Sequence, residues 1–247
     1  MPEISIKAEQ LFELWHISIT NSMLLSLVTL ALLVAFALYM RKHMSAVPGK
    51  LQSVFELLRE QILEFMESVL GNRHAAEKYF PLIATAFLFI LISNWLGLLP
   101  IVGPIGLRHV TEEGSGLIPL FRAPAADLNF TLALALISVF SINLISVLAI
   151  GIKKYIGRFI QPRSPIMTGV GIIEIFSEFV RIISFSFRLF GNVFAGEVIL
   201  IVMAFLAPLI LPLPFLFLEI FVGFIQAFIF SMLTLVFISM GVSETSH

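Results

Sequence analysis

The chain has 247 residues, of which 59% are hydrophobic and 13% are charged, and its mean hydropathy is +1.03. Soluble domains carry about 25% charged residues, so a globule of this composition could not cover its surface with solvated groups. The composition therefore indicates an integral membrane protein. The formal net charge of -1 provides no basic excess to hold a polyanion, which argues against binding of nucleic acid.

Several kinds of chemistry are excluded by missing residue types. The chain has no cysteine, which excludes disulfides, thiol nucleophiles and thiolate metal sites. Its single aspartate, Asp127, excludes a catalytic aspartate pair, and its five histidines lie outside the long apolar runs. No metalloprotease, serine-hydrolase or phosphate-loop motif is present. We therefore expect no catalytic chemistry in this chain, no cofactor and no metal.

Three apolar runs are long enough to cross about 30 Å of hydrocarbon as helices. They cover residues 23–40, 80–99 and 128–152. Trp95, near the end of the second run, is expected to be an interfacial anchor. Between the first two runs, residues 51–70 have apolar side chains at helical spacing and glutamates on the opposite side. This segment is expected to be an amphipathic helix that lies at the membrane interface or against a partner.

The last apolar stretch, 166–240, is too long for one crossing and contains prolines at its middle, at Pro208, Pro212 and Pro214. The pattern predicts two long helices, 166–206 and 215–240, that form a C-terminal hairpin. A helix of about forty residues is roughly 60 Å long, about twice the hydrocarbon thickness. The first of the two must therefore be steeply tilted or project from the membrane.

The orientation follows from the basic residues of the loops, which are retained on the cytoplasmic side. Residues 41–78 hold six lysines and arginines and 153–163 hold four, whereas 101–126 hold two. We expect segment 1–22 to be extracytoplasmic and the C-terminus cytoplasmic. Because the first ten residues are acidic, the first span is interpreted as a retained helix. The chain, 1–247, is thus expected to be a single all-α membrane domain of about five transmembrane helices plus the amphipathic helix.

Ionisable groups inside a membrane are costly, and each is a functional hypothesis by default. The two long helices contain eight ionisable or amide side chains: Glu174, Glu178, Arg181, Arg188, Asn192 and Glu197 in the first, and Glu219 and Gln226 in the second. At about 100° per residue, five of the first six fall on one helix face within about 80°, whereas Glu197 lies about 180° from Arg188.

Each polar group also has a structural interpretation. Glu178 and Arg181 are spaced for a local ion pair, with Glu174 nearby. Asn192 and Gln226 could be interhelical hydrogen-bond partners. Arg188, however, has no carboxylate within one turn. Its counter-charge is expected from another polypeptide, or alternatively from Glu219 through an intrachain bridge.

Two groups of residues resemble subunit a of the rotary F-type ATP synthase, in its bacterial form. The first is Arg188-Leu-Phe-Gly-Asn192, followed by Gly196-Glu197 and, in the last span, by Gln226-Ala-Phe-Ile-Phe. The second is the run 124–131, Pro-Ala-Ala-Asp-Leu-Asn-Phe-Thr, ahead of the third span. The resemblance is densest over 124–132 and 174–240, about a third of the chain.

The resemblance implies a proton-translocating stator subunit in which Arg188 faces a ring of c subunits, each with an intramembrane carboxylate. Protons would pass between two offset half-channels and drive rotation and ATP synthesis. The positions that the resemblance assigns to this pathway are Glu197, Glu219, Asn192 and Gln226, with Glu174 and Ser184 toward the cytoplasmic side. One departure is that many bacterial members pair a glutamate with a histidine where this chain has Glu197 and Glu219.

The implied partners are the c ring, b-type peripheral stalk subunits and the rest of the synthase, in the inner membrane of a bacterial cell. The alternative is a stand-alone proton channel or secondary transporter, which would need a closed pathway within one chain. No convincing internal repeat supports an inverted-repeat transporter. Transport by the purified chain in liposomes, without partner subunits, would favour this alternative.

Overall fold

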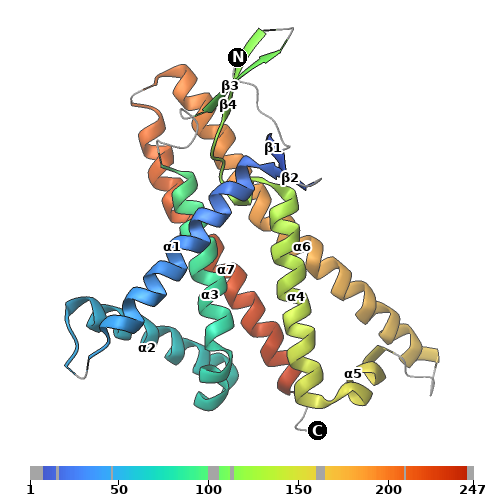
Figure 1. Cartoon of the computed structure of the whole chain (residues 1–247). Coiled ribbons are helices and arrows are strands. Elements are labelled where there is room, and N and C mark those ends of the chain that lie inside the picture. The colour runs from blue at the N-terminus through green and yellow to red at the C-terminus, as the bar shows by residue number, and fades with distance from the viewer. Residues whose placement is uncertain are drawn as a thin grey trace.

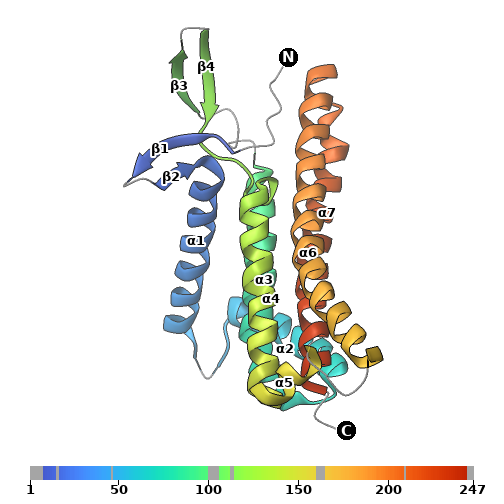
Figure 2. The same ribbon diagram turned by 90° about the vertical axis from the view of Figure 1, so that its right-hand side faces the viewer.

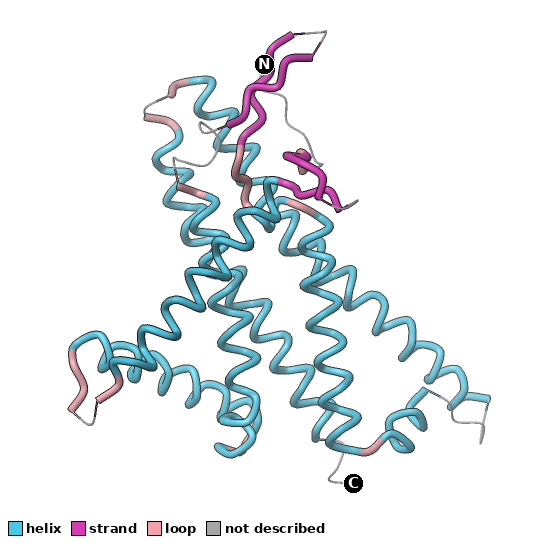
Figure 3. The backbone as a smooth tube through the Cα atoms, in the orientation of Figure 1, coloured by secondary structure: helices cyan, strands magenta, loops and turns pink. Residues whose placement is uncertain are grey.

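The computed structural model describes residues 8–14, 17–45, 47–99, 106–111, 114–159, 165–208 and 210–243. Helices dominate this part of the chain (Figure 3). Five of them are long and apolar enough to cross a membrane, which confirms the prediction of an all-α integral membrane protein. The five are α1 (Asn21–His43), α3 (Arg73–Gly97), α4 (Leu128–Ile150), α6 (Pro165–Leu206) and α7 (Pro212–Ser243).

The five long helices are arranged in three layers (Figure 2). The pair α3 and α4 lies in the middle, with α1 on one side and α6 and α7 on the other. α7 packs against α3 and α4, and α6 packs against α4 and α7. Figure 1 shows α6 inclined steeply to α4, as its length of 42 residues requires. α6 thus presents one long side to its neighbours and leaves the other open.

The proline-rich break between the two last helices is shorter than predicted. α7 begins at Pro212, three residues before the expected start at 215. A proline is tolerated in the first turn of a helix because the N–H that it lacks would have no intrahelical partner there. α3 likewise begins at Arg73, before the expected 80, where Asn72 caps the helix by accepting from the His74 N–H at 2.8 Å.

The amphipathic helix is α2 (Lys50–Leu70), which packs against α3 and α7. Its apolar side buries Leu63 and Met66 completely. On its polar side, Arg73 bonds Glu60 at 2.7 Å and lies 3.6 Å from Glu67. The hydrogen bond from Arg73 holds the pKa of Glu60 below its usual value. The acidic side is therefore partly neutralised by the first residue of α3.

Short elements that the sequence pattern did not predict connect these helices. Two antiparallel hairpins, β1 (Gln10–Leu14) with β2 (Ile17–Thr20) and β3 (Gly106–Thr111) with β4 (Gly114–Pro119), precede α1 and η1. A 3₁₀ turn, η1 (Pro124–Ala126), precedes α4, and the short helix α5 (Ile152–Phe159) follows α4. Strands of four to six residues are too short to give a clear alternating pattern in the sequence.

Asp127 joins three of these elements at one point. Its carboxylate caps α4 by accepting from the Asn129 N–H at 3.0 Å, and it accepts from the Ser22 hydroxyl of α1 at 2.6 Å. Beside it, the Asn21 amide donates to the Pro119 carbonyl of β4 at 3.3 Å. The start of α1, the end of β4 and the start of α4 are thereby held together, which fixes the segment between β4 and η1.

Candidate functional site

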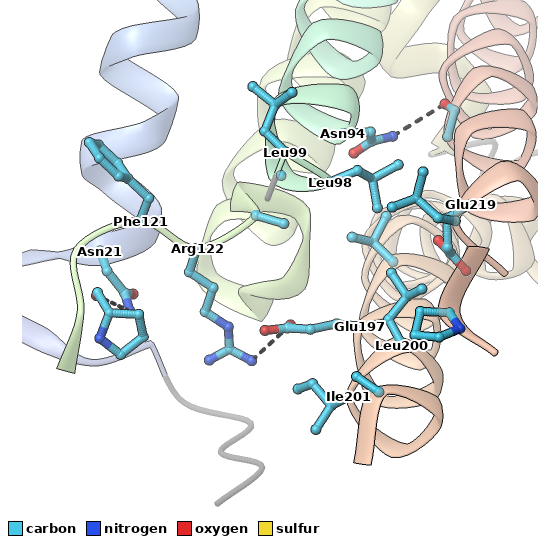
Figure 4. Close-up of a pocket in the computed structure, with 18 of the residues that line it drawn as sticks. Asn21, Asn94, Leu98, Leu99, Phe121, Arg122, Glu197, Leu200, Ile201 and Glu219 are labelled. Carbon is cyan, nitrogen blue, oxygen red and sulfur yellow. Dashed lines mark hydrogen bonds and ion pairs between the residues drawn. The ribbon is translucent and has the colours of Figure 1, made fainter. Parts of the chain in front are cut away.

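The C-terminal part of α6 borders a cavity of about 510 Å³, here called the Glu197 cavity (Figure 4). α6 contributes Val193, Glu197, Leu200, Ile201 and Ala204 to its wall. α7 contributes Glu219, and the segment before η1 contributes Arg122. Two of the predicted site residues, Glu197 and Glu219, therefore line one cavity.

The N-terminal part of α6 borders a second hollow of about 410 Å³, here called the Arg188 cavity. Its polar lining comes from Ser177, Arg181, Ser184 and Arg188 of α6. No described residue lines both cavities. Between them along α6 lies Leu189, which is fully buried with Ala227 of α7. An apolar layer therefore separates two polar hollows that follow one another along the same helix.

Arg188 is partly exposed and is bonded only weakly within the chain. Its Nη2 donates to the Ser184 hydroxyl at 3.1 Å. Among the described residues, no carboxylate lies within 4.0 Å of its guanidinium. The alternative of an Arg188–Glu219 bridge is therefore wrong for this structure. Small exposed residues, Gly191 and Ala195, follow Arg188 on α6.

The two amide side chains form the predicted interhelical contact. Asn192 Nδ2 donates to Gln226 Oε1 at 2.7 Å, and Gln226 is buried with 2% exposed. This bond ties α6 to α7 one turn after Arg188. It supplies a polar bridge beside the apolar layer that separates the two cavities.

The two glutamates line one cavity because α6 and α7 approach closely at Gly196. Arg122 Nη2 lies 3.3 Å from Glu197 Oε2, and Figure 4 shows this pair pointing into the cavity. The Glu219 carboxylate packs against Gly196, where the Cβ of any other residue would overlap it. A larger residue at 196 would displace the Glu219 carboxylate from this position. Glu197 and Arg188 face different sides of α6, about 180° apart around the helix.

A local ion pair occupies the start of α6, as the spacing predicted. Arg181 Nη1 bonds Glu178 Oε1 at 2.8 Å, and Asn143 of α4 donates to the other carboxylate oxygen at 3.2 Å. The Arg181 guanidinium also lies over the Phe237 ring at 3.9 Å. Glu174, one turn earlier, is not among the residues that line either cavity.

Sequence reasoning missed four polar residues that line the Glu197 cavity: Glu9, Asn21, Asn94 and Arg122. Asn94 Nδ2 donates to the Gly223 carbonyl at 3.3 Å and so ties α3 to α7. The sequence signal for Asn94 was an amide side chain inside the apolar run 80–99. Trp95 is partly exposed, and its ring N–H donates to the Ile220 carbonyl at 3.1 Å, so it also joins α3 to α7. For Arg122 the only signal was its place just before Pro124 and Asp127.

The part of the chain that the structure describes contains no group of three potential metal ligands from histidine, cysteine, aspartate or glutamate. The polar groups that the cavities do contain are carboxylates, guanidiniums, amides and hydroxyls. Such groups can bind, orient and release protons. A partly desolvated pair of carboxylates next to a fixed cation is suited to that task.

Comparison with known proteins gives consistent matches. The family described as ATP synthase A chain matches residues 23–239. A protein named ATP synthase subunit a from Helicobacter hepaticus is 37% identical over 217 residues, which cover 86% of this chain and 85% of the relative. Its namesake from Mycobacterium ulcerans is 34% identical over 235 residues, 92% of this chain and 90% of the relative. The protein of the same name from Desulforamulus reducens is 35% identical over 250 residues, which cover 94% of this chain and 85% of the relative.

Proposed function

The chain belongs to the ATP synthase A chain family, and from that membership we propose that its two cavities are the two half-channels of a proton pathway. The chain is a multi-pass membrane protein and the proton-translocating subunit of the membrane sector of ATP synthase. Arg188 is the charge that separates the two half-channels. Glu197, Glu219, Asn192 and Gln226 belong to one side of it, and Ser184 and Glu174 to the other.

The observation that supports this proposal most strongly is the order of features along α6. The Glu197 cavity lies on the C-terminal part of the helix and the Arg188 cavity on its N-terminal part. Arg188 and Glu197 are nine residues apart, or about 14 Å along the axis. A proton cannot cross the buried layer at Leu189 directly. It has to leave this chain on one side of Arg188 and return on the other.

A partner carboxylate is the group that best accepts the proton between the two half-channels. Arg188 lies on a side of α6 with exposed apolar residues, among them Val202 at 42% exposed, which falls about 40° from Arg188 around the helix. An arginine in the bilayer without a counter-charge costs at least about 3 kcal/mol on insertion scales. A ring of c subunits would present one carboxylate after another to Arg188. The small residues Gly191 and Ala195 allow close approach.

Rotation follows from the fixed charge. A ring carboxylate that has lost its proton to one half-channel is attracted to Arg188, and it moves on when a proton from the other half-channel neutralises it. The guanidinium remains protonated throughout. Each proton that crosses 100 mV releases about 2.3 kcal/mol, so several are needed for each ATP. In this account the chain gates protons and performs no covalent chemistry.

The orientation follows from the loop charges. The β1–β2 and β3–β4 hairpins and the Glu197 cavity then face outward from a bacterial inner membrane, and α2, α5 and the end of α7 face the cytoplasm. Exposed apolar residues on α2, such as Leu51 at 70% exposed, and on α1 offer surfaces for b-type stalk subunits. The remainder of the synthase completes the set of partners.

Single thiols test the two half-channels, since the chain has no cysteine of its own. We expect Ala204→Cys, in the Glu197 cavity, to react with a membrane-impermeant thiol reagent added outside. Ser177→Cys, in the Arg188 cavity, should react only with reagent on the cytoplasmic side. The measurement is the mass of the labelled chain, in the intact complex in sealed vesicles of known orientation.

The matched control is Phe140→Cys on α4, which is 68% exposed but borders neither cavity. A charged reagent should leave this thiol unlabelled from either side because it faces hydrocarbon. Labelling of Ala204→Cys and Ser177→Cys from one and the same side would contradict two half-channels that open oppositely.

A further inference from the structure

Arg122 is a buried cation at the Glu197 cavity. Its side chain is 8% exposed, and it pairs with Glu197, whose side chain is 31% exposed. Among the described residues that line the cavity it is the one basic side chain. It comes from the segment before η1 and reaches α6 from across the cavity (Figure 4). Burial of a guanidinium is costly unless the opposing charge is well placed, so this pair is held by the fold.

The backbone that follows Arg122 is held in place by its packing. Ala123 packs closely on Gly97 of α3. A Cβ added at Gly97 would lie 2.5 Å from the Cβ of Ala123. The η1 turn that follows is buried, with Ala125 at 1% and Ala126 at 0% exposed, and Asp127 is bonded to Ser22. Arg122 is therefore presented to Glu197 by a rigid support, as a preorganised charge requires.

The charges around the cavity are unequal. Three of its described lining residues carry a carboxylate, Glu9 before β1, Glu197 on α6 and Glu219 on α7, while α3 contributes the neutral Asn94. The guanidinium is paired with Glu197, whereas Glu219 has no ion pair among the described residues and packs on Gly196. An adjacent positive charge favours the ionised form of a carboxylate. A proton that enters the cavity is therefore expected to bind Glu219, which has no cation beside it, rather than Glu197.

We propose that Arg122 is a positioning residue that keeps Glu197 ionised and directs the incoming proton to Glu219. This inference rests on the proposed function of the Glu197 cavity as a half-channel. A proton from the outer solution binds a Glu219 oxygen and then leaves it for the ring carboxylate, so that the carboxylate of Glu219 is regenerated. Glu197 stays paired with its guanidinium, so the pair is neutral overall and Glu219 is left as the carboxylate that binds the proton.

The experiment measures proton flux through the complete complex in vesicles as a function of external pH. With Arg122 present, Glu219→Gln should reduce flux on the order of tenfold more than Glu197→Gln. In an Arg122→Gln background, the two glutamine substitutions should have similar effects, because the two glutamates are then nearly equivalent. Arg122→Gln alone should extend flux to an external pH higher by about one unit, since Glu197 then also binds a proton.

Two further variants separate positioning from folding. Arg122→Lys keeps the charge, so it should preserve the unequal effects of the two glutamine substitutions. The double variant Arg122→Gln/Glu197→Gln removes both charges, so it should assemble even if Arg122→Gln does not, and its pH profile should match that of Glu197→Gln alone. The inference would be overturned if Arg122→Gln lowered flux equally at every pH, and if Glu219→Gln still reduced flux more than Glu197→Gln in that background.

The outcomes also separate this inference from the proposed function. If both glutamine substitutions lower flux but their ratio does not depend on Arg122, the inference fails and the half-channel stands. If neither substitution changes flux, the Glu197 cavity is not a half-channel, and the proposed function fails together with the inference.

Discussion

Replacement of Arg188 by alanine is expected to abolish both proton-driven ATP synthesis and ATP-driven proton pumping, while the complex still assembles. The physical reason is that Arg188 bonds only the Ser184 hydroxyl within the described chain, so that folding does not depend on a buried ion pair. Coupling depends on the fixed charge, which attracts each ionised ring carboxylate and blocks direct passage between the half-channels. Both directions are measured in vesicles, together with the subunit composition of the complex.

Arg188→Lys should fail or be severely impaired, because an ammonium is a compact point charge without the planar fork of a guanidinium. The matched control is Arg41→Ala, which removes an exposed arginine from the last turn of α1. That variant should retain synthesis and pumping. Full coupled activity in Arg188→Ala would refute the assigned role of this residue.

Simultaneous replacement of Glu197 and Glu219 by glutamine is expected to reduce proton flux by about two orders of magnitude or more, the loss typical when a proton-transfer group is removed. The change preserves shape and hydrogen-bonding capacity but removes the carboxylates that α6 and α7 contribute to the Glu197 cavity. Flux is measured as the collapse of an imposed pH gradient in vesicles that contain the complete complex.

A double change of similar size outside the cavities provides the control for this variant. Glu60→Gln/Glu67→Gln alters two glutamates of α2 that contact Arg73 and face away from both cavities. Flux should remain near the unmodified level in this control. If the Glu197/Glu219 variant conducts equally well, these two glutamates are structural.

The sequence predicted those features that depend on local periodicity. Five apolar helices, the amphipathic helix and the polar side of α6 all follow from residues within a few turns of one another. The absence of a carboxylate within one turn of Arg188 also correctly indicated that this charge lacks an intrahelical ion pair. The Asn192–Gln226 contact was within reach because both are isolated amides in otherwise apolar spans.

Features that depend on packing between distant segments could not be predicted. The helix wheel placed Glu197 opposite Arg188, but it gave no reason to bring Glu197 to Glu219 or to Arg122. That cavity depends on the close approach of α7 at Gly196 and on the support of Arg122 by Gly97 and Asp127. The two β-hairpins escaped prediction because their strands are too short to give a clear pattern.

The central claim is that Arg188 faces a carboxylate of another polypeptide within the membrane, and a cross-link at Ala195 tests it most directly. Ala195 is exposed, lies seven residues after Arg188 and so falls within about 20° of it on the same side of α6. A single thiol at this position can hold a photoactivatable cross-linker in the native complex, with Phe140→Cys on α4 as the control.

The measurement is the identification of the cross-linked peptide by mass spectrometry. The account predicts that Ala195→Cys is joined to a small hairpin subunit near its intramembrane carboxylate, and that Phe140→Cys is not. Cross-linking of Ala195→Cys only to lipid or to its own chain, in a complex that retains coupled activity, would contradict it.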